Sequence, residues 1–166
     1  MRSETDGGPP PPPPFRAKVV LTRKQLFGLP VLFAIPLIAL AGLLGESTGH
    51  VVASSSQLEL RVDFPSRGHY REIQGLHVMV RNRTTRPIDT ITVRFDASYM
   101  NAFSQVRFEP SPTRAYDILL TSVGPGYTRL VAVELSGDRY GRHRGEVSVS
   151  GGTDTVRAGF NTFVFP

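Results

Sequence analysis

The chain has 166 residues and no cysteine, which excludes disulfides, thiolate metal sites and cysteine nucleophiles. This length accommodates one domain of about 110 residues and one further segment. A domain of that size can bury a proper hydrophobic core. Although the formal net charge is +5, residues 57–166 carry fourteen Arg against eleven Asp and Glu. That surplus is too small and too scattered to indicate a nucleic-acid-binding face.

Residues 1–24 are predicted to form a Pro-rich, basic tail. Consecutive prolines adopt an extended polyproline II rod without internal hydrogen bonds. Two interpretations stay open: a spacer without partners, or a strap that docks on a partner with little loss of entropy. On the second, the contacts of the tail would be Pro9, Pro10, Pro11, Pro12, Pro13, Pro14 and Phe15.

A basic collar follows the prolines and contains no acid. Its cations are suited to the lipid headgroup layer. The predicted headgroup contacts are Arg16, Lys18, Arg23 and Lys24.

Residues 25–45 are predicted to form one transmembrane helix. The run from Leu26 to Gly45 holds twenty residues without a charge. At about 1.5 Å per helical residue it spans roughly 30 Å, the thickness of the hydrocarbon core of a bilayer. A cleaved signal peptide is the alternative, but its apolar core is usually about 7–15 residues long, which favours a retained anchor. Ala41 and Gly45, four residues apart, would allow another helix to approach closely.

Charge predicts the orientation of this anchor. Cations precede the run, whereas Glu46 follows it and the next cation is Arg61. Positive residues remain on the cytoplasmic side. With an Arg-rich composition typical of a GC-rich bacterium, we expect a single-pass protein of the bacterial inner membrane with a cytoplasmic N-terminus and a periplasmic C-terminal domain.

Beyond the anchor, residues 46–56 are small and polar and are predicted to be a flexible linker. Residues 57–166 then show short runs of alternating apolar residues, separated by turn residues, without helical periodicity. Turns are expected at Pro65–Gly68, 83–87 and 124–126, a loop at Gly137–Gly145 and a hairpin at 150–154. The predicted strands, about eight, cover 57–64, 76–82, 91–96, 103–108, 116–120, 127–135, 147–149 and 155–165.

This pattern predicts a mainly β domain, an antiparallel β-sandwich, preceded by one N-terminal transmembrane helix. In strand number and spacing, residues 57–166 resemble immunoglobulin-like and fibronectin-III-like modules. The layout of anchor plus sandwich is similar to that of the single-span accessory subunits of bacterial photosynthetic reaction-centre–light-harvesting complexes and respiratory complexes. The resemblance implies a role in binding other subunits, without a cofactor.

No catalytic or metal-binding pattern can be assembled from the sequence. The four histidines show no ligand spacing, the aspartates are scattered, and no nucleophile turn surrounds any serine. Asn82-Arg83-Thr84 fits the glycosylation triplet, which we interpret as chance in a bacterial chain. We therefore expect no enzyme activity, no cofactor, no metal, no small-molecule substrate and no nucleic-acid partner.

Two features indicate partner contacts in the domain. Arginines cluster at two predicted loops, either as solvated loops or as contacts to lipid headgroups or an acidic partner. The C-terminal strand carries three phenylalanines, and alternation places Phe163 and Phe165 on the face opposite Phe160, if this is an edge strand. All three could instead be core residues. The candidate contacts are Arg81, Arg83, Arg86, Arg142, Arg144, Phe163 and Phe165.

The sequence thus favours a non-catalytic, single-pass accessory or scaffold subunit that stabilises a larger bacterial membrane complex of photosynthetic or respiratory type. The anchor would lie in the bilayer, and the helix, the tail and the sandwich would contact other membrane-protein subunits. The alternative is a free-standing, membrane-anchored periplasmic module for binding or adhesion.

Overall fold

The computed structural model describes residues 28, 30, 32–34, 36–37, 45 and 47–166. Residues 1–41 and 42–166 form two units, each considered by itself. In the first unit the described residues, all within 28–37, are helical. Within the part of the chain that the structure describes, no helix is long and apolar enough to cross a membrane.

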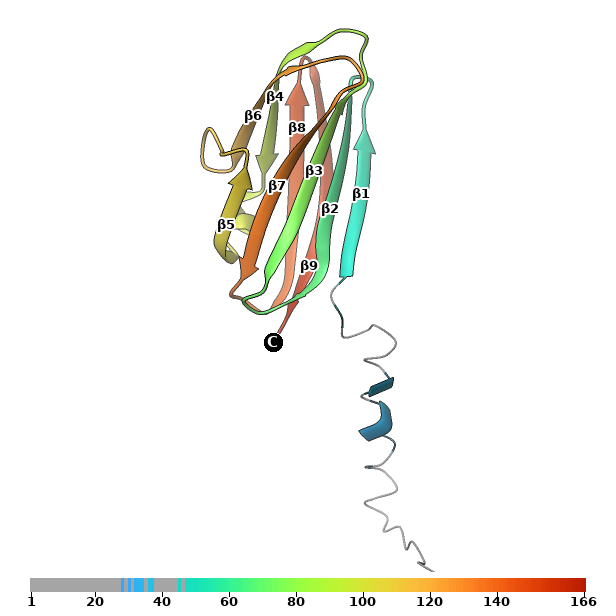
Figure 1. Cartoon of the computed structure of the whole chain (residues 1–166), viewed down its shortest axis with the longest axis vertical. Coiled ribbons are helices and arrows are strands. Elements are labelled where there is room, and N and C mark those ends of the chain that lie inside the picture. Colours follow the sequence, from blue (N-terminus) through green and yellow to red (C-terminus); the bar gives the residue numbers. More distant parts are fainter. Residues whose placement is uncertain (1–27, 29, 31, 35, 38–44, 46) are drawn as a thin grey trace, which may run out of the picture. The chain divides into compact units, whose positions relative to one another are not determined.

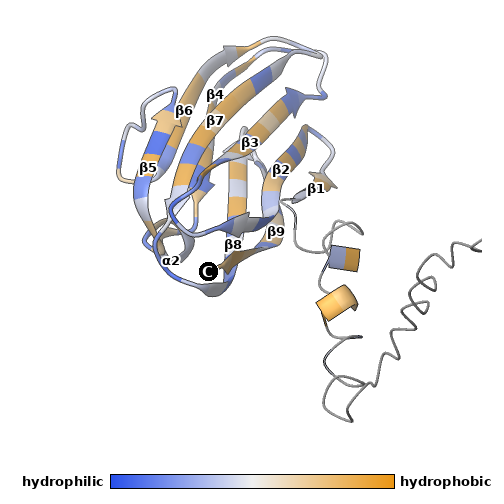
Figure 2. Ribbon diagram, turned by 60° about the horizontal axis from the view of Figure 1, so that its bottom comes forward, coloured by the Kyte–Doolittle hydropathy of each residue, from blue (hydrophilic) through white to orange (hydrophobic). Residues whose placement is uncertain are grey.

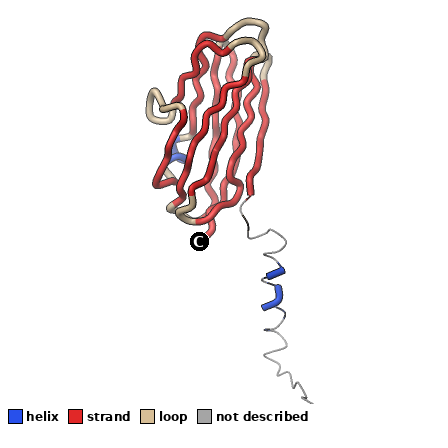
Figure 3. The backbone as a smooth tube through the Cα atoms, in the orientation of Figure 1, coloured by secondary structure: helices blue, strands red, loops and turns tan. Residues whose placement is uncertain are grey.

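The second unit is almost entirely β-structure (Figures 1 and 3). One short helix, α2 (Ala97–Met100), follows the fourth strand and is capped by the Asp96 side chain, which accepts a hydrogen bond from the Ser98 backbone N–H. The strands are β1 (Ser47–Ser54), β2 (Leu58–His69), β3 (Ile73–Asn82), β4 (Ile88–Phe95), β5 (Phe103–Glu109), β6 (Asp117–Val123), β7 (Thr128–Gly137), β8 (Gly141–Gly151) and β9 (Asp154–Phe165).

Two groups of strands pack face to face, as expected for a sandwich. The first has the order β5-β7-β3-β2, with β1 added to β2, and the second has the order β9-β8-β4-β6. Neighbours are antiparallel except at one place, where residues 67–69 of β2 run parallel to residues 163–165 of β9. The start of β2 pairs with β3 and its end pairs with β9, so this long strand joins the two groups.

The core is formed by alternate residues of the strands, as the period of two requires (Figure 2). On β2 and β3 these are Leu58, Leu60 and Val62 facing Leu76, Val78 and Val80, all fully buried. An aromatic cluster closes one part of the core: the Phe160 ring lies 5.1 Å from the rings of both Phe64 and Tyr99, centroid to centroid. Burial raises the pKa of Tyr99 to about 12, and its hydroxyl is hydrogen-bonded to that of Thr162.

Three expectations about local structure are wrong. Most of the expected linker 46–56 is strand β1, whose residues 47–54 pair with residues 59–67 of β2. The expected turn Pro65–Gly68 is a continuation of β2, and the expected loop Gly137–Gly145 contains only a short turn before β8 begins at Gly141. In each case small or polar residues suggested a loop, but hydrogen bonding to a neighbouring strand keeps the backbone extended.

The structure of the last strand also contradicts one of the two interpretations of its sequence. β9 is not an edge strand, because β8 pairs with it from residue 154 to residue 164 and β2 pairs with its end. Alternation nevertheless holds: Phe160 is buried, Phe163 is 41% exposed and Phe165 is half-buried. Phe160 is therefore a core residue, and the other two lie on the outward face.

One buried polar side chain conflicts with its surroundings. Gln74, on β3, is 6% exposed, and its amide nitrogen and oxygen have no hydrogen-bond partner among the described residues. It lies directly over Gly68, where even a Cβ would overlap the amide nitrogen. A buried amide without partners destabilises a fold by about 1–3 kcal/mol.

The variant Gln74→Met keeps the side-chain length and removes the unpaired groups. We expect the free energy of unfolding to rise by about 1–2 kcal/mol, measured by urea denaturation. Gln105→Met, at an exposed position of β5, is the matched control and should stay within about 0.5 kcal/mol. A loss of stability in Gln74→Met would mean that the amide is satisfied by water.

Candidate interaction surface

The outward side of β8 and β9 brings together four of the predicted partner contacts. Arg142 pairs with Phe163 and Arg144 pairs with Asn161 across the two strands. Because outward residues on neighbouring strands lie side by side, Arg142, Arg144, Asn161, Phe163 and Phe165 form one continuous surface, here called the β8–β9 face. Arginine and phenylalanine on one surface are the composition typical of a protein interface.

The geometry of the β8–β9 face is fixed by local contacts. Arg142 Nε donates a hydrogen bond of 3.2 Å to Asn161 Oδ1, and the rings of Phe163 and Phe165 lie 4.6 Å apart, centroid to centroid. Gly159 exposes its backbone here, and Arg142, Arg144 and Asn161 surround it in a shallow depression of about 570 Å³. The arginines of this surface can bind a carboxylate or carbonyl group of a partner, and the phenylalanines beside them can contact one of its apolar side chains.

The second predicted arginine cluster lies at the other end of the sandwich. Arg81, Arg83 and Arg86 are exposed around the β3–β4 loop, beside the end of β1. Arg83 donates a hydrogen bond of 3.2 Å to the carbonyl of Ser55. The β8–β9 face instead ends beside the beginning of β1, since Ser47 pairs with Arg67 and Arg67 with Phe163. The two clusters therefore cannot contact one partner site together.

Asn82 organises the loop of this second cluster. Its side chain is fully buried and donates hydrogen bonds to the carbonyls of Arg86 and Val123, while its oxygen accepts from Thr84. The amide nitrogen of the glycosylation triplet is thus occupied inside the fold, which supports the interpretation of that triplet as chance.

The remaining predicted contacts fall outside the second unit or at its margin. Gly45 is an exposed bend. The others lie outside the described residues: Pro9, Pro10, Pro11, Pro12, Pro13, Pro14, Phe15, Arg16, Lys18, Arg23, Lys24 and Ala41.

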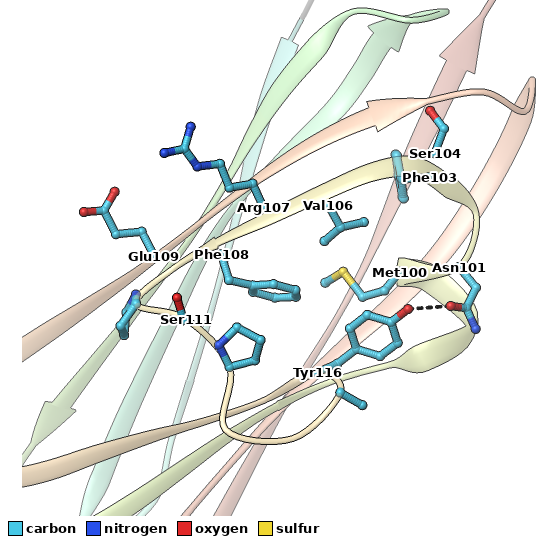
Figure 4. Close-up of a pocket in the computed structure, with 13 residues that line it drawn as sticks. Met100, Asn101, Phe103, Ser104, Val106, Arg107, Phe108, Glu109, Ser111 and Tyr116 are labelled. Atoms are coloured by element: carbon cyan, nitrogen blue, oxygen red, sulfur yellow. Dashed lines mark hydrogen bonds between the residues drawn. The ribbon is translucent and has the colours of Figure 1, made fainter.

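A groove of about 880 Å³ lies between β5 and the loop that leads to β6 (Figure 4). Its inner wall is aromatic, with the Phe108 ring 5.4 Å from that of Phe95 and 6.2 Å from that of Tyr116. The Tyr116 hydroxyl donates a hydrogen bond to Asn101 Oδ1. Phe108 and Tyr116 pack against the core, and Arg107 and Glu109 are the charged residues of the lining.

The titratable groups with shifted pKa values have structural roles. The Arg94 guanidinium, which donates two hydrogen bonds of 2.9 Å to Asp117 on the neighbouring strand, lowers the pKa of that carboxyl. The Ser98 side chain lowers the pKa of Asp96 at the cap of α2. Among the described residues, no group of three His, Asp or Glu side chains converges on a possible metal position.

Sequence reasoning missed the aromatic residues of two turns. Tyr70 and Tyr140 lie seventy positions apart, yet their rings are 4.8 Å apart, centroid to centroid. The only signal was that each tyrosine stands next to an arginine, as Tyr70-Arg71 and Arg139-Tyr140. Such dipeptides are too common to indicate proximity without the strand topology.

Comparison with known proteins gives likeness of fold alone. No protein-family model matches the chain, and no curated protein matches its sequence. Solved structures that it resembles include the CARDB domain of a Pyrococcus furiosus protein, at 15% identity and a TM-score of 0.45, over 67% of this chain and 96% of that one. A cohesin module of a Clostridium perfringens family 33 glycoside hydrolase has 10% identity and a TM-score of 0.48, over 66% and 98%. The PapD-like domain of human CEP192 has 14% identity and a TM-score of 0.38, over 67% and 87%. The strand order of the domain itself, in two groups packed face to face, is that of a mainly β sandwich.

Proposed function

We propose that the chain is a non-catalytic accessory subunit, held at a membrane by the apolar run 26–45, whose sandwich docks against neighbouring membrane-protein subunits. The observation that carries this proposal is the position of β1. Only Glu46 separates the apolar run from Ser47, the first residue of the sandwich. Two residues of extended chain reach roughly 7 Å, so a sandwich tethered in this way would stay at the membrane surface.

This short connection favours a subunit over a free-standing binding module. A module that searches for distant ligands needs a long, flexible linker, and the segment expected to supply it is strand β1. A domain kept at the surface meets mainly other proteins of the same membrane. The β8–β9 face offers arginines beside exposed phenylalanine for such a contact. As the partner we propose a bacterial photosynthetic or respiratory complex, on likeness of layout alone.

Native purification tests this function. We expect the tagged full-length chain, extracted in mild detergent, to elute together with other membrane subunits. The variant Arg142→Ser/Arg144→Ser/Phe163→Ser should weaken that association by about tenfold or more, because anchors of this kind cost over 1 kcal/mol each. The matched control Arg107→Ser/Arg129→Ser/Leu130→Ser removes two exposed arginines and one exposed apolar residue from the other group of strands. It should leave co-elution unchanged.

Two outcomes contradict the proposal. If the chain elutes alone at its own mass, a free-standing binding module replaces the subunit. If both variants lose the partners equally, the β8–β9 face is not the docking surface.

A further inference from the structure

Two turns at the same end of the sandwich carry tyrosine and arginine together. These basal turns are residues 70–72, between β2 and β3, and residues 138–140, between β7 and β8. The rings of Tyr70 and Tyr140 contact each other, and the Arg71 guanidinium lies 5.1 Å from the centroid of the Tyr70 ring. Tyr140 is 56% exposed, and Arg71 and Arg139 are exposed. The basal turns thus present amphipathic rings and cations to the surroundings.

Backbone hydrogen bonds hold the first basal turn in place. The Tyr70 N–H donates to the carbonyl of Phe165 at 3.0 Å, and the Arg71 N–H donates to the carbonyl of Gly137 at 2.8 Å. Arg71 adopts a positive φ of 61°, and its guanidinium lies over the Tyr70 ring. The ends of β7 and β9 therefore fix this turn, and little entropy remains to be lost when it binds a surface.

Connectivity places the basal turns close to the point where the apolar run ends. Ser47 pairs with Arg67 of β2, three residues before Tyr70. With strands about 5 Å apart and about 3.3 Å per strand residue, the turn lies within roughly 15 Å of Ser47. Ser47 itself is two residues beyond Gly45. The same end of the sandwich holds the start of β1 and the C-terminus (Figure 1).

The charge of this end fits an anionic surface. Outside the β8–β9 face, the described residues of this end include three arginines, at 67, 71 and 139, and two acids, Glu72 and Asp138, a surplus of one positive charge. Tyrosine rings are enriched at the level of lipid headgroups, and arginines near a membrane surface are attracted to anionic lipids. At the opposite end, the turn 124–127 exposes Tyr127 without a second ring beside it among the described residues.

We propose that the basal turns rest in the anionic headgroup layer of the membrane, so that the sandwich stands end-on with the β8–β9 face directed sideways. This inference rests on the proposed function, because it needs the apolar run to hold the chain in a bilayer. It assigns the lipid contact to Tyr70, Arg71, Arg139 and Tyr140 and leaves the β8–β9 face for protein partners.

Because the chain has no cysteine, one introduced cysteine at either end of the sandwich can carry a single fluorescent label. Full-length Ile73→Cys, next to the first basal turn, and Thr85→Cys, in the loop at the opposite end, would each carry one fluorophore after reconstitution. The vesicles would contain phosphatidylcholine, about 30% phosphatidylglycerol and headgroup-spin-labelled lipid. We expect quenching at position 73 to exceed that at position 85 by about threefold or more.

Paired variants then test the cations. In the Ile73→Cys chain, Arg71→Asn/Arg139→Ser should lower quenching at least twofold, because two of the three arginines of this end are lost. Asn at position 71 tolerates the positive φ. Arg81→Ser/Arg86→Ser removes the same charge from the opposite end and should change nothing. Raising salt should weaken the effect, since exposed charges are screened.

Each outcome separates the two proposals. A chain that does not float with the vesicles overturns the membrane-held function. A chain that floats but shows equal quenching at positions 73 and 85 overturns only the headgroup contact. If position 73 is shielded solely when co-purified subunits are present, the basal turns bind protein, and the lipid assignment is likewise overturned.

Discussion

A fragment of residues 57–166, the domain boundary that the sequence suggests, should be markedly less stable than a fragment of residues 45–166. The shorter fragment lacks β1, which pairs with eight residues of β2. Val51 and Ala53 of β1 pack against the core, and Gly49 approaches the Phe64 ring so closely that a Cβ would lie 2.6 Å from it. Losing this cover and the backbone hydrogen bonds should cost about 3 kcal/mol or more.

Urea denaturation of both fragments measures this difference. The shorter fragment also exposes the edge of the long strand β2, which can pair with another chain, so we expect concentration-dependent association in size-exclusion chromatography. A fragment of residues 47–166 controls for chain length and should behave like 45–166. Equal stability of 57–166 and 45–166 would mean that β1 is only loosely attached to the sandwich.

Phe160→Ala should have the largest effect of any single substitution on β9. Phe160 is 3% exposed and contacts the rings of Phe64 and Tyr99, so its removal leaves a cavity where three aromatic side chains meet. Gly145 on β8 provides the space for the ring, since a Cβ there would lie 2.7 Å from Phe160. We expect a loss of about 3–5 kcal/mol in the free energy of unfolding, a large share of the stability of a small domain.

The matched control is Phe163→Ala, three residues further along the same strand. Phe163 lies on the β8–β9 face and is 41% exposed, and its ring contacts only that of Phe165 among the described aromatic rings, so this variant should cost about 1 kcal/mol, well below Phe160→Ala. Urea denaturation measures both variants, with the same dependence of the free energy of unfolding on urea concentration applied to each. If Phe163→Ala is as destabilising as Phe160→Ala, the outward face of β9 is part of a core, and the β8–β9 face is not available to partners.

The amino-acid sequence was sufficient to predict which face of most strands is buried. Alternation in Leu58–Phe64 and Leu76–Val80 identified the inward side chains, because successive residues of a strand point to opposite sides wherever the strand lies. Alternation also suggested opposite faces for Phe160 and Phe163, although a core position for both stayed open. It could not tell whether β9 had neighbours on both sides, because pairing depends on residues far away in the chain.

The candidate surface shows the same limit. The sequence indicated Arg142, Arg144, Phe163 and Phe165 as separate features of a loop and a terminus, and only the β8–β9 register made them one face. Conversely, Arg81, Arg83 and Arg86 were candidates of equal standing, and the topology placed them at the opposite end. Tyr70 and Tyr140 carried no sequence signal strong enough to pair them.

By itself, the sequence determined the mainly β character of the domain, the inward face of its strands and the position of the uncharged run, because these depend on local period and composition. Only the tertiary structure decided that residues 47–54 are a strand, which strands are neighbours, and which arginines share a surface with aromatic rings. These properties arise from hydrogen bonds between segments far apart in the chain, and no local pattern encodes the identity of the partner segment.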